Sequence, residues 1–192
     1  MIHCVGGGNL SFAIYKYFGD IVKIYSSHIS DKYISYQIET LKDQIKDGDI
    51  VIYNRISSLR THYIEENTNK DLNDLKTCLS VCQHFNVKFV FISSISSVSL
   101  DTCYGRTKKI MENMVRYTSS YYIIRPSVIR YYENTRVDDT STIENLSLNA
   151  ASTLTTRLSK KSAEENGTFP LPIYKLLFLL EEIISNNTYA RI

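Results

Sequence analysis

A tyrosine and a lysine four residues apart are the strongest candidates for chemistry in this chain. They stand in Tyr104-Gly105-Arg106-Thr107-Lys108, and Ser94 precedes the tyrosine by ten positions. On a helix, a spacing of four places two side chains on one face. A nearby ammonium favours the phenolate and lowers the phenol pKa from about 10 toward the range of a general base. We therefore expect Tyr104 to exchange a proton with a substrate oxygen that Ser94 hydrogen-bonds.

The position of this motif in the chain is stronger evidence for catalysis than its spacing, because the same spacing arises by chance in a chain with 15 tyrosines. It follows a strongly apolar segment, Val87 to Ile92, which reads as a strand buried on both faces. Ser93 and Ser94 close that segment. The motif therefore lies just beyond a central strand of the predicted sheet.

A glycine-rich turn near the start of the chain is the second candidate. The apolar run Ile2 to Val5 leads into Gly6-Gly7-Gly8-Asn9-Leu10-Ser11, and helical spacing follows. Gly6 permits a tight turn and Gly8 lets the backbone approach a phosphate, while Ser11 takes the place of a third glycine. We predict that residues 6 to 11, including Asn9 and Leu10, bind a dinucleotide pyrophosphate. A plain strand–helix turn, or a turn for S-adenosylmethionine, fits the same pattern.

The end of the second predicted strand bears on which dinucleotide is bound. Folds that bind NAD usually carry an acidic residue there to hold the ribose hydroxyls. This chain instead has Tyr25-Ser26-Ser27-His28. Ser26 and Ser27 could donate hydrogen bonds to a 2′-phosphate, which favours NADP over NAD. The alternative is that these serines simply end the strand.

Strands and helices alternate along the chain. We predict strands at 2–5, 21–25, 49–53, 87–92 and 121–124, with helices at 12–18, 36–45, 72–82 and 105–117. This order predicts an α/β fold with a doubly wound parallel sheet, a Rossmann fold of strand order 3-2-1-4-5 with residues 189–192 as a candidate sixth strand. We expect one domain over 1–192, in which the polar segment 133–170, with a weak helix at 143–158, covers the cleft. A last helix runs to about residue 185.

The composition excludes several other classes of protein. The 192 residues carry 22 basic and 20 acidic side chains, a net charge of +2, which disfavours nucleic-acid binding. No apolar stretch reaches the ~20 residues of a membrane span, and the start lacks a secretory signal, so we expect a cytoplasmic protein. Cys78 and Cys82 lack the partners of a metal site and are expected to pack in the core.

These motifs together resemble the short-chain dehydrogenase/reductase superfamily, and within it the NAD-dependent epimerase/dehydratase branch. The resemblance covers about residues 1 to 130 and rests on residues 5–11, 87–94, 104–108 with Glu112, and 123–128. It implies a Ser94, Tyr104 and Lys108 triad, with Lys108 also reaching the nicotinamide ribose. It further implies a nicotinamide side lined by Asn54 and by Pro126 to Val128, and a nucleotide-sugar substrate.

The chain also departs from that family. Ser11 replaces a glycine, the acidic ribose ligand is missing, the connection from Ser94 to Tyr104 is short, and the C-terminal substrate lobe is reduced. The helical asparagine of the family has no certain match, since Asp71 and Asn73 both lie near its place. Two alternatives to the epimerase/dehydratase reading therefore stay open: a small carbonyl reductase, and an inactive NAD(P)-binding sensor or partner subunit.

Two arginines and one helix complete the predictions. Arg125 and Arg130 flank the exit of the fifth predicted strand, where either could bind a substrate phosphate or serve a structural role. Arg130 is the better candidate for substrate binding. By analogy with the superfamily, we expect a homodimer in which the 105–117 helix pairs between subunits.

Overall fold

The computed structural model describes residues 1–27, 34–58, 62–126, 129–130 and 171–185. It divides into two compact units, Met1–Arg125 and Pro126–Ile192. Each unit is described by itself.

The first unit is built on a six-stranded parallel sheet of order β3-β2-β1-β4-β5-β6. In chain order the strands are β1 (Ile2–Val5), β2 (Val22–Tyr25), β3 (Ser35–Tyr36), β4 (Ile50–Tyr53), β5 (Lys88–Ile92) and β6 (Tyr121–Ile124). Every residue of β1 and β4 is buried, because a central parallel strand is covered on both faces. The sheet confirms the predicted doubly wound α/β fold.

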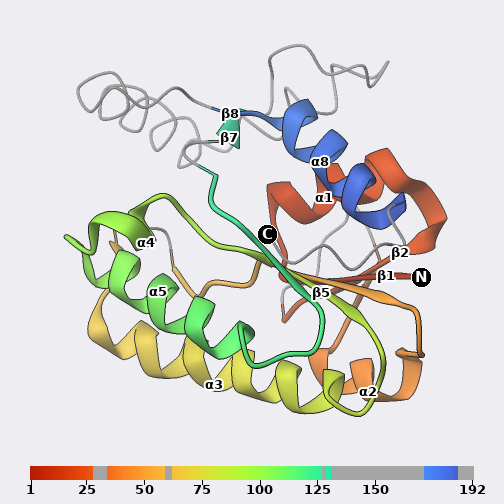
Figure 1. The fold of residues 1–192 in the computed structure, drawn as a ribbon, viewed down its shortest axis with the longest axis horizontal. Helices are drawn as coiled ribbons and strands as arrows, with labels where there is room; N and C mark the ends of the chain where they lie inside the picture. Colours follow the sequence, from red (N-terminus) through yellow and green to blue (C-terminus); the bar gives the residue numbers. More distant parts are fainter. Residues whose placement is uncertain (28–33, 59–61, 127–128, 131–170, 186–192) are drawn as a thin grey trace. The chain divides into compact units, whose positions relative to one another are not determined.

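Helices cover both faces of this sheet. They are α1 (Asn9–Phe18), α2 (Leu41–Gln44), α3 (Glu65–Cys82), α4 (Ser96–Ser99) and α5 (Cys103–Val115). Helices α3 and α5 run side by side over one face, with α2 on the same side, and α1 lies on the opposite face (Figure 1). The candidate chemistry on α5 is therefore carried by a helix that packs directly along α3.

The residues that form the third strand differ from the prediction. The strand beside β2 is β3, Ser35–Tyr36. Residues 50–53, which lie in the segment predicted as the third strand, form β4 and pair with β1. The predicted helix at 36–45 is wrong: only a 3₁₀ turn at Ile38–Thr40 and the short α2 form there. The Tyr36 carbonyl accepts a hydrogen bond from Ser26 N–H at 2.9 Å, and the Tyr36 ring lies 5.8 Å from that of Tyr25. These pairing contacts hold Tyr36 in an extended conformation, despite helical spacing in the sequence.

The core beneath α3 and α5 takes up two of the cysteines. Cys78 and Cys82 are both buried beside Phe89 and Val115, as predicted. The described residues contain no cluster of three or more potential metal ligands.

The second unit has few described residues. Strand β7 (Ile129–Arg130) pairs in parallel with β8 (Leu171–Pro172), and α8 (Ile173–Ser185) follows, as the expected last helix. The predicted cover at 133–170, its weak helix and the strand at 189–192 lie outside the described residues. The single-domain interpretation stays a prediction.

Candidate functional site

The glycine turn connects β1 to α1 with two residues in backbone conformations that favour glycine. Gly6 has a φ of +133°, and a Cβ there would collide with the Asn54 side chain and the Arg55 backbone. Gly8, at the N-terminus of α1, has a φ of +86°, and a Cβ there would meet no atom within 4 Å. The N-cap residue Gly8 has no side chain with which to cap α1, and the first turn of the helix holds no acidic residue. This helix N-terminus therefore fits an anion such as a pyrophosphate.

Ser11 shapes this turn from inside the protein. Its side chain is fully buried, and its Oγ donates to the Gly6 carbonyl at 2.6 Å while accepting from Asn54 Nδ2 at 3.0 Å. Ser11 and Asn54 thus tie the turn after β1 to the segment after β4. Sequence reasoning missed this link, because nothing in either local pattern indicates the other. Of the remaining turn residues, Leu10 is buried and Asn9 half-buried.

The end of β2 carries no carboxylate. Ser26 is buried and Ser27 is exposed, directly after the buried Tyr25. His28 lies outside the described residues. The choice between NAD and NADP therefore stays a prediction.

The segment between Ser94 and Tyr104 is a compact connection that contains α4. Thr102 caps α5 by accepting a hydrogen bond from Gly105 N–H at 3.0 Å. A Cβ on Gly105 would collide with the Ser96 carbonyl, so only glycine lets α5 approach α4 this closely. Leu100, with a φ of +60°, ends α4 in the left-handed region. The single turn of α4 thus lets a short connection return the chain to the end of β5.

The hydroxyl of Ser94 is oriented by the backbone. Its Oγ accepts from Ser96 N–H at 3.2 Å, which leaves the hydroxyl hydrogen to donate elsewhere. The Ser94 side chain is buried, whereas Tyr104 in the first turn of α5 is half-buried.

Lys108 lies next to Tyr104, as the spacing of four predicts. Its Nζ is 5.9 Å from the centroid of the Tyr104 ring and 4.9 Å from that of Phe91. Nζ donates a hydrogen bond to the Ile92 carbonyl at 3.0 Å, and the side chain is buried. Burial lowers the pKa of Lys108 to about 8, against the opposing charges of Asp71 and Glu112. The lysine is therefore buried, next to a tyrosine that is only half-buried.

A second tyrosine, which the sequence did not single out, contacts Tyr104. The rings of Tyr63 and Tyr104 meet edge to face, with centroids 5.5 Å apart. Tyr63 OH donates to Asp71 Oδ2 at 2.6 Å, and Ser57 N–H donates to Asp71 Oδ1 at 2.9 Å. Asp71, on α3, therefore fixes the segment after β4 against α3, and the Tyr63 ring brings that segment into contact with α5.

Glu112 anchors the other side of α5. This buried carboxylate accepts from Ser93 Oγ and Ser97 Oγ, both at 2.7 Å, and from Arg125 Nε and Nη2 at 2.7 and 2.8 Å. Burial alone would raise the pKa of Glu112, but these hydrogen bonds and the Arg125 charge lower it to about 2. Arg125 thus makes a structural ion pair, the second of the two roles considered for it.

The structure does not place Pro126, Val128 or Arg130 relative to this site. Pro126 belongs to the second unit. Val128 and the side chain of Arg130 lie outside the described residues.

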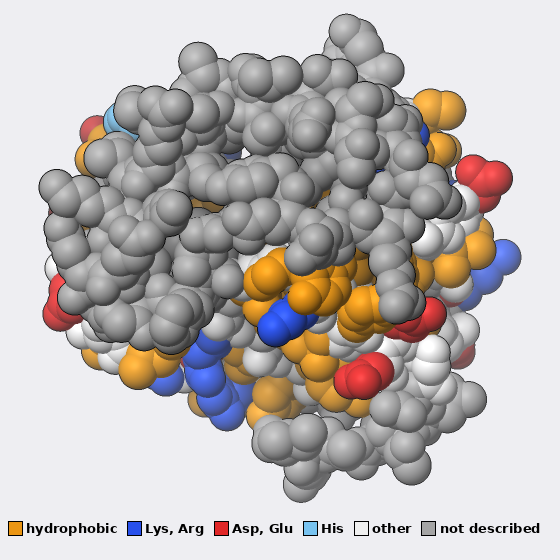
Figure 2. Space-filling view, turned by 90° about the horizontal axis from the view of Figure 1, so that it is seen from above, with side chains coloured by type: hydrophobic (Ala, Val, Ile, Leu, Met, Phe, Trp, Pro, Cys, Tyr) orange, Lys and Arg blue, Asp and Glu red, His pale blue; other side chains and the backbone are white. Residues whose placement is uncertain are grey.

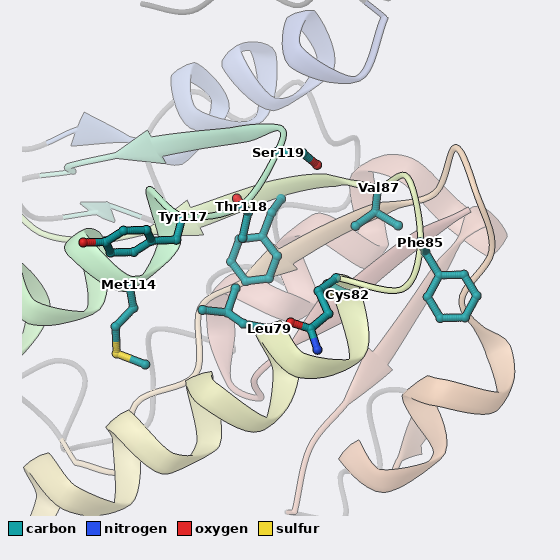
Figure 3. Close-up of a pocket in the computed structure, with 10 residues that line it drawn as sticks. Leu79, Cys82, Phe85, Val87, Met114, Tyr117, Thr118 and Ser119 are labelled. Atoms are coloured by element: carbon teal, nitrogen blue, oxygen red, sulfur yellow. The ribbon is translucent and has the colours of Figure 1, made fainter.

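A separate pocket lies at the other ends of α3 and α5 (Figure 3). It has a volume of about 330 Å³. Its lining includes Leu79, Phe85, Val87, Met114 and Tyr117. Val87 precedes β5, whereas Ser94 follows it, so this pocket is not part of the candidate site.

Hydrophobic and charged side chains of the described residues share one face of the molecule (Figure 2). On the face in Figure 2, hydrophobic, basic and acidic side chains of the described residues intermingle. None of the described helices is both long and apolar enough to span a membrane.

Comparisons with known proteins show similarity in fold alone. No protein-family model matches the sequence, and no curated protein matches it. Pal from Bacillus thuringiensis matches with a TM-score of 0.56 at 17% identity, over 70% of this chain and 58% of that one. A thiolation-reductase di-domain from an archaeal non-ribosomal peptide synthetase matches with a TM-score of 0.54 at 15% identity, over 76% of this chain and 57% of that one.

A third structure is a Bacillus halodurans protein named for the NAD-dependent epimerase/dehydratases. It matches with a TM-score of 0.46 at 14% identity, over 70% of this chain and 74% of that one. The chain spans less than two thirds of the length of the first two structures. At low sequence identity, the first two structures therefore share the fold of this chain, an α/β fold with a parallel sheet of the Rossmann type.

Proposed function

We propose that this chain is an NAD(P)-dependent oxidoreductase of the epimerase/dehydratase type, with Tyr104 as its proton-transferring group. The observation that supports it is the adjacency of Lys108 and Tyr104 at the start of α5, on a sheet whose first turn fits an anion. The turn after β1 and Ser94 after β5 both follow the carboxyl ends of parallel strands. Ligands of open α/β sheets bind at that edge.

Each side chain has a distinct task in this proposal. Residues Gly6 to Ser11 would hold the cofactor pyrophosphate, and the bound nicotinamide would supply the hydride chemistry. Ser94 would donate its hydroxyl hydrogen to the substrate oxygen, because its Oγ already accepts from Ser96 N–H. Tyr104 would give a proton to that oxygen or remove one from it. The charge of Lys108 would favour the Tyr104 phenolate.

The finer assignments depend on the family resemblance. We favour NADP because no carboxylate follows β2 in the described residues. We favour a nucleotide sugar as the substrate. A small carbonyl compound is the alternative, and the short connection between Ser94 and Tyr104 supports it because few side chains there could contact a large substrate.

One observation favours a nucleotide-binding protein without catalysis. Lys108 Nζ is buried and bonded to the Ile92 carbonyl at 3.0 Å. A ribose could bond Nζ only by reaching this buried position, because the side chain is almost fully shielded from solvent. In this alternative, nucleotide binds and no substrate is turned over.

Replacement of the Tyr104 hydroxyl tests the enzymatic proposal. We expect reduction of NADP⁺ or NAD⁺, followed by absorbance, with at least one member of a panel of nucleotide sugars and small alcohols. Tyr104→Phe should lower turnover by about 10² to 10⁴ while leaving cofactor affinity unchanged. Tyr117→Phe is the matched control, because Tyr117 is 92% exposed just beyond α5. Equal turnover in both variants would refute the role of Tyr104, and cofactor binding without turnover in wild type would support the non-catalytic alternative.

We further propose that the protein is a homodimer through α5. The helix exposes Ile110, which is 44% accessible. Gel filtration should give an apparent mass of twice 22.1 kDa. A species at the mass of one chain would contradict this proposal.

A further inference from the structure

Lys108 carries a buried charge that has no adjacent counter-ion among the residues that the structure describes. Its Nζ donates to a neutral carbonyl, and none of the ion pairs within 4.0 Å among the described residues includes it. A buried ammonium is costly unless an opposite charge compensates for it. The Tyr104 ring lies beside Lys108 and contacts the Tyr63 ring, and the two carboxylates whose charges act on Lys108 are Asp71 on α3 and Glu112 on α5.

The first of the two carboxylates, Glu112, is already neutralised. Arg125 binds it with two hydrogen bonds, at 2.7 and 2.8 Å, and Lys109 lies 3.7 Å away. Two serine hydroxyls complete its shell. Arg125 and Lys109 therefore offset much of the electrostatic attraction between Glu112 and Lys108.

The second carboxylate, Asp71, has no adjacent cation among the described residues. It is fully buried, and it accepts hydrogen bonds from two neutral donors, Tyr63 OH and Ser57 N–H. No cation lies within 4.0 Å of it in the described part of the chain. Burial raises the pKa of Asp71, while its hydrogen bonds and the Lys108 charge lower it.

We propose that Asp71 is the counter-charge of Lys108 across the α3–α5 interface, and hence a positioning residue for the Tyr104–Lys108 pair. This inference rests on the function proposed above for that pair. Asp71 keeps Lys108 protonated, so that the charge beside the Tyr104 ring is present when the phenol loses its proton.

Tyr63 links Asp71 to the same site by a second route. Its hydroxyl is held by Asp71 at 2.6 Å, and its ring packs edge-on against Tyr104. One carboxylate on α3 therefore supports both members of the pair: Lys108 through charge and Tyr104 through the Tyr63 ring.

Titration of Lys108 by NMR tests the inference without any substrate. In the full chain with ¹³C-labelled lysine, Lys108→Met identifies the resonance of Lys108. Asp71→Asn should weaken the proton affinity of Lys108 about tenfold, which moves its titration midpoint to lower pH. Asp74→Asn is the matched control: it makes the same change on α3, where the carboxylate instead pairs with Arg55 at 2.7 Å. An unmoved Lys108 midpoint in folded Asp71→Asn would overturn the inference.

A reciprocal measurement covers the case in which Asp71→Asn does not fold. Coupling between two sites is mutual, so Lys108→Met should raise the titration midpoint of the Asp71 carboxyl ¹³C. An unchanged Asp71 midpoint would again overturn the inference. Neither titration involves nucleotide, so failure of NADPH and NADH to bind refutes the proposed function and not the charge pairing.

Discussion

Replacing Glu112 by glutamine should destabilise the protein substantially. The carboxylate is fully buried and receives two hydrogen bonds from Arg125 and one each from Ser93 and Ser97. Its pKa falls from an ordinary 4.5 to about 2, which corresponds to about 3 kcal/mol of stability at neutral pH. Because the Arg125 side chain is 34% exposed, water recovers part of its hydration in the variant. We therefore expect Glu112→Gln to lose about 2 to 3 kcal/mol.

Urea unfolding followed by circular dichroism measures this loss. Since the folded-state pKa is depressed, the contribution of Glu112 is complete above pH 4.5 and disappears as the pH falls toward 2. The difference between wild type and Glu112→Gln should therefore shrink in acid. Glu66→Gln on the exposed side of α3 is the control, with an expected change within about 0.5 kcal/mol. A loss at pH 7 no larger than that of the control would refute the reasoning.

Three further predictions concern stability. Tyr53 is fully buried and its hydroxyl has no hydrogen-bond partner in the described part of the chain, so Tyr53→Phe should raise the free energy of unfolding by about 1 kcal/mol; a decrease in urea unfolding would contradict this. Gly105→Ala should cost about 1 to 3 kcal/mol, because the methyl group collides with the Ser96 carbonyl; an unchanged melting temperature would argue against that contact. Burial lowers the pKa of His3 below 6.5, against its hydrogen bond to Asp49, so stability should decline as the pH falls from 6.5 through the folded-state pKa. His3→Gln should remove that decline, and a decline of the same size in the variant would assign it to other groups.

The fold could be predicted because its signals are local. The run from Phe89 to Ile92 is continuously apolar, as a central parallel strand requires, and glycines follow β1 where the backbone has positive φ. The adjacency of Tyr104 and Lys108 is equally local, since it depends only on helical spacing. The helix prediction at 36–45 was wrong because it counted Tyr36 as helical. Tyr36 instead pairs with β2 as an extended residue, and only the single turn Leu41–Gln44 is α-helical.

The supporting contacts of the site could not be predicted, because they join distant parts of the chain. Asp71 is one acidic residue among several on a polar helix, and only the fold brings it to Tyr63 and Ser57. The bond between Ser11 and Asn54 spans 43 positions. For Arg125, the sequence allowed a phosphate or a structural partner, and packing of β6 beside β5 placed it on Glu112.

Calorimetric titration with NADPH and NADH tests the central claim most directly, that the turn after β1 binds a nicotinamide dinucleotide. Wild type should bind at least one of them, and Gly8→Ala should weaken binding at least tenfold, because it adds a methyl group at the N-cap of α1, where the pyrophosphate would bind. Gly19→Ala is the control: it adds a methyl group in open space at a φ of +68°, but at the other end of α1, and should bind as wild type does. Absence of binding heat with both nucleotides, or equal weakening by the two variants, would contradict the claim.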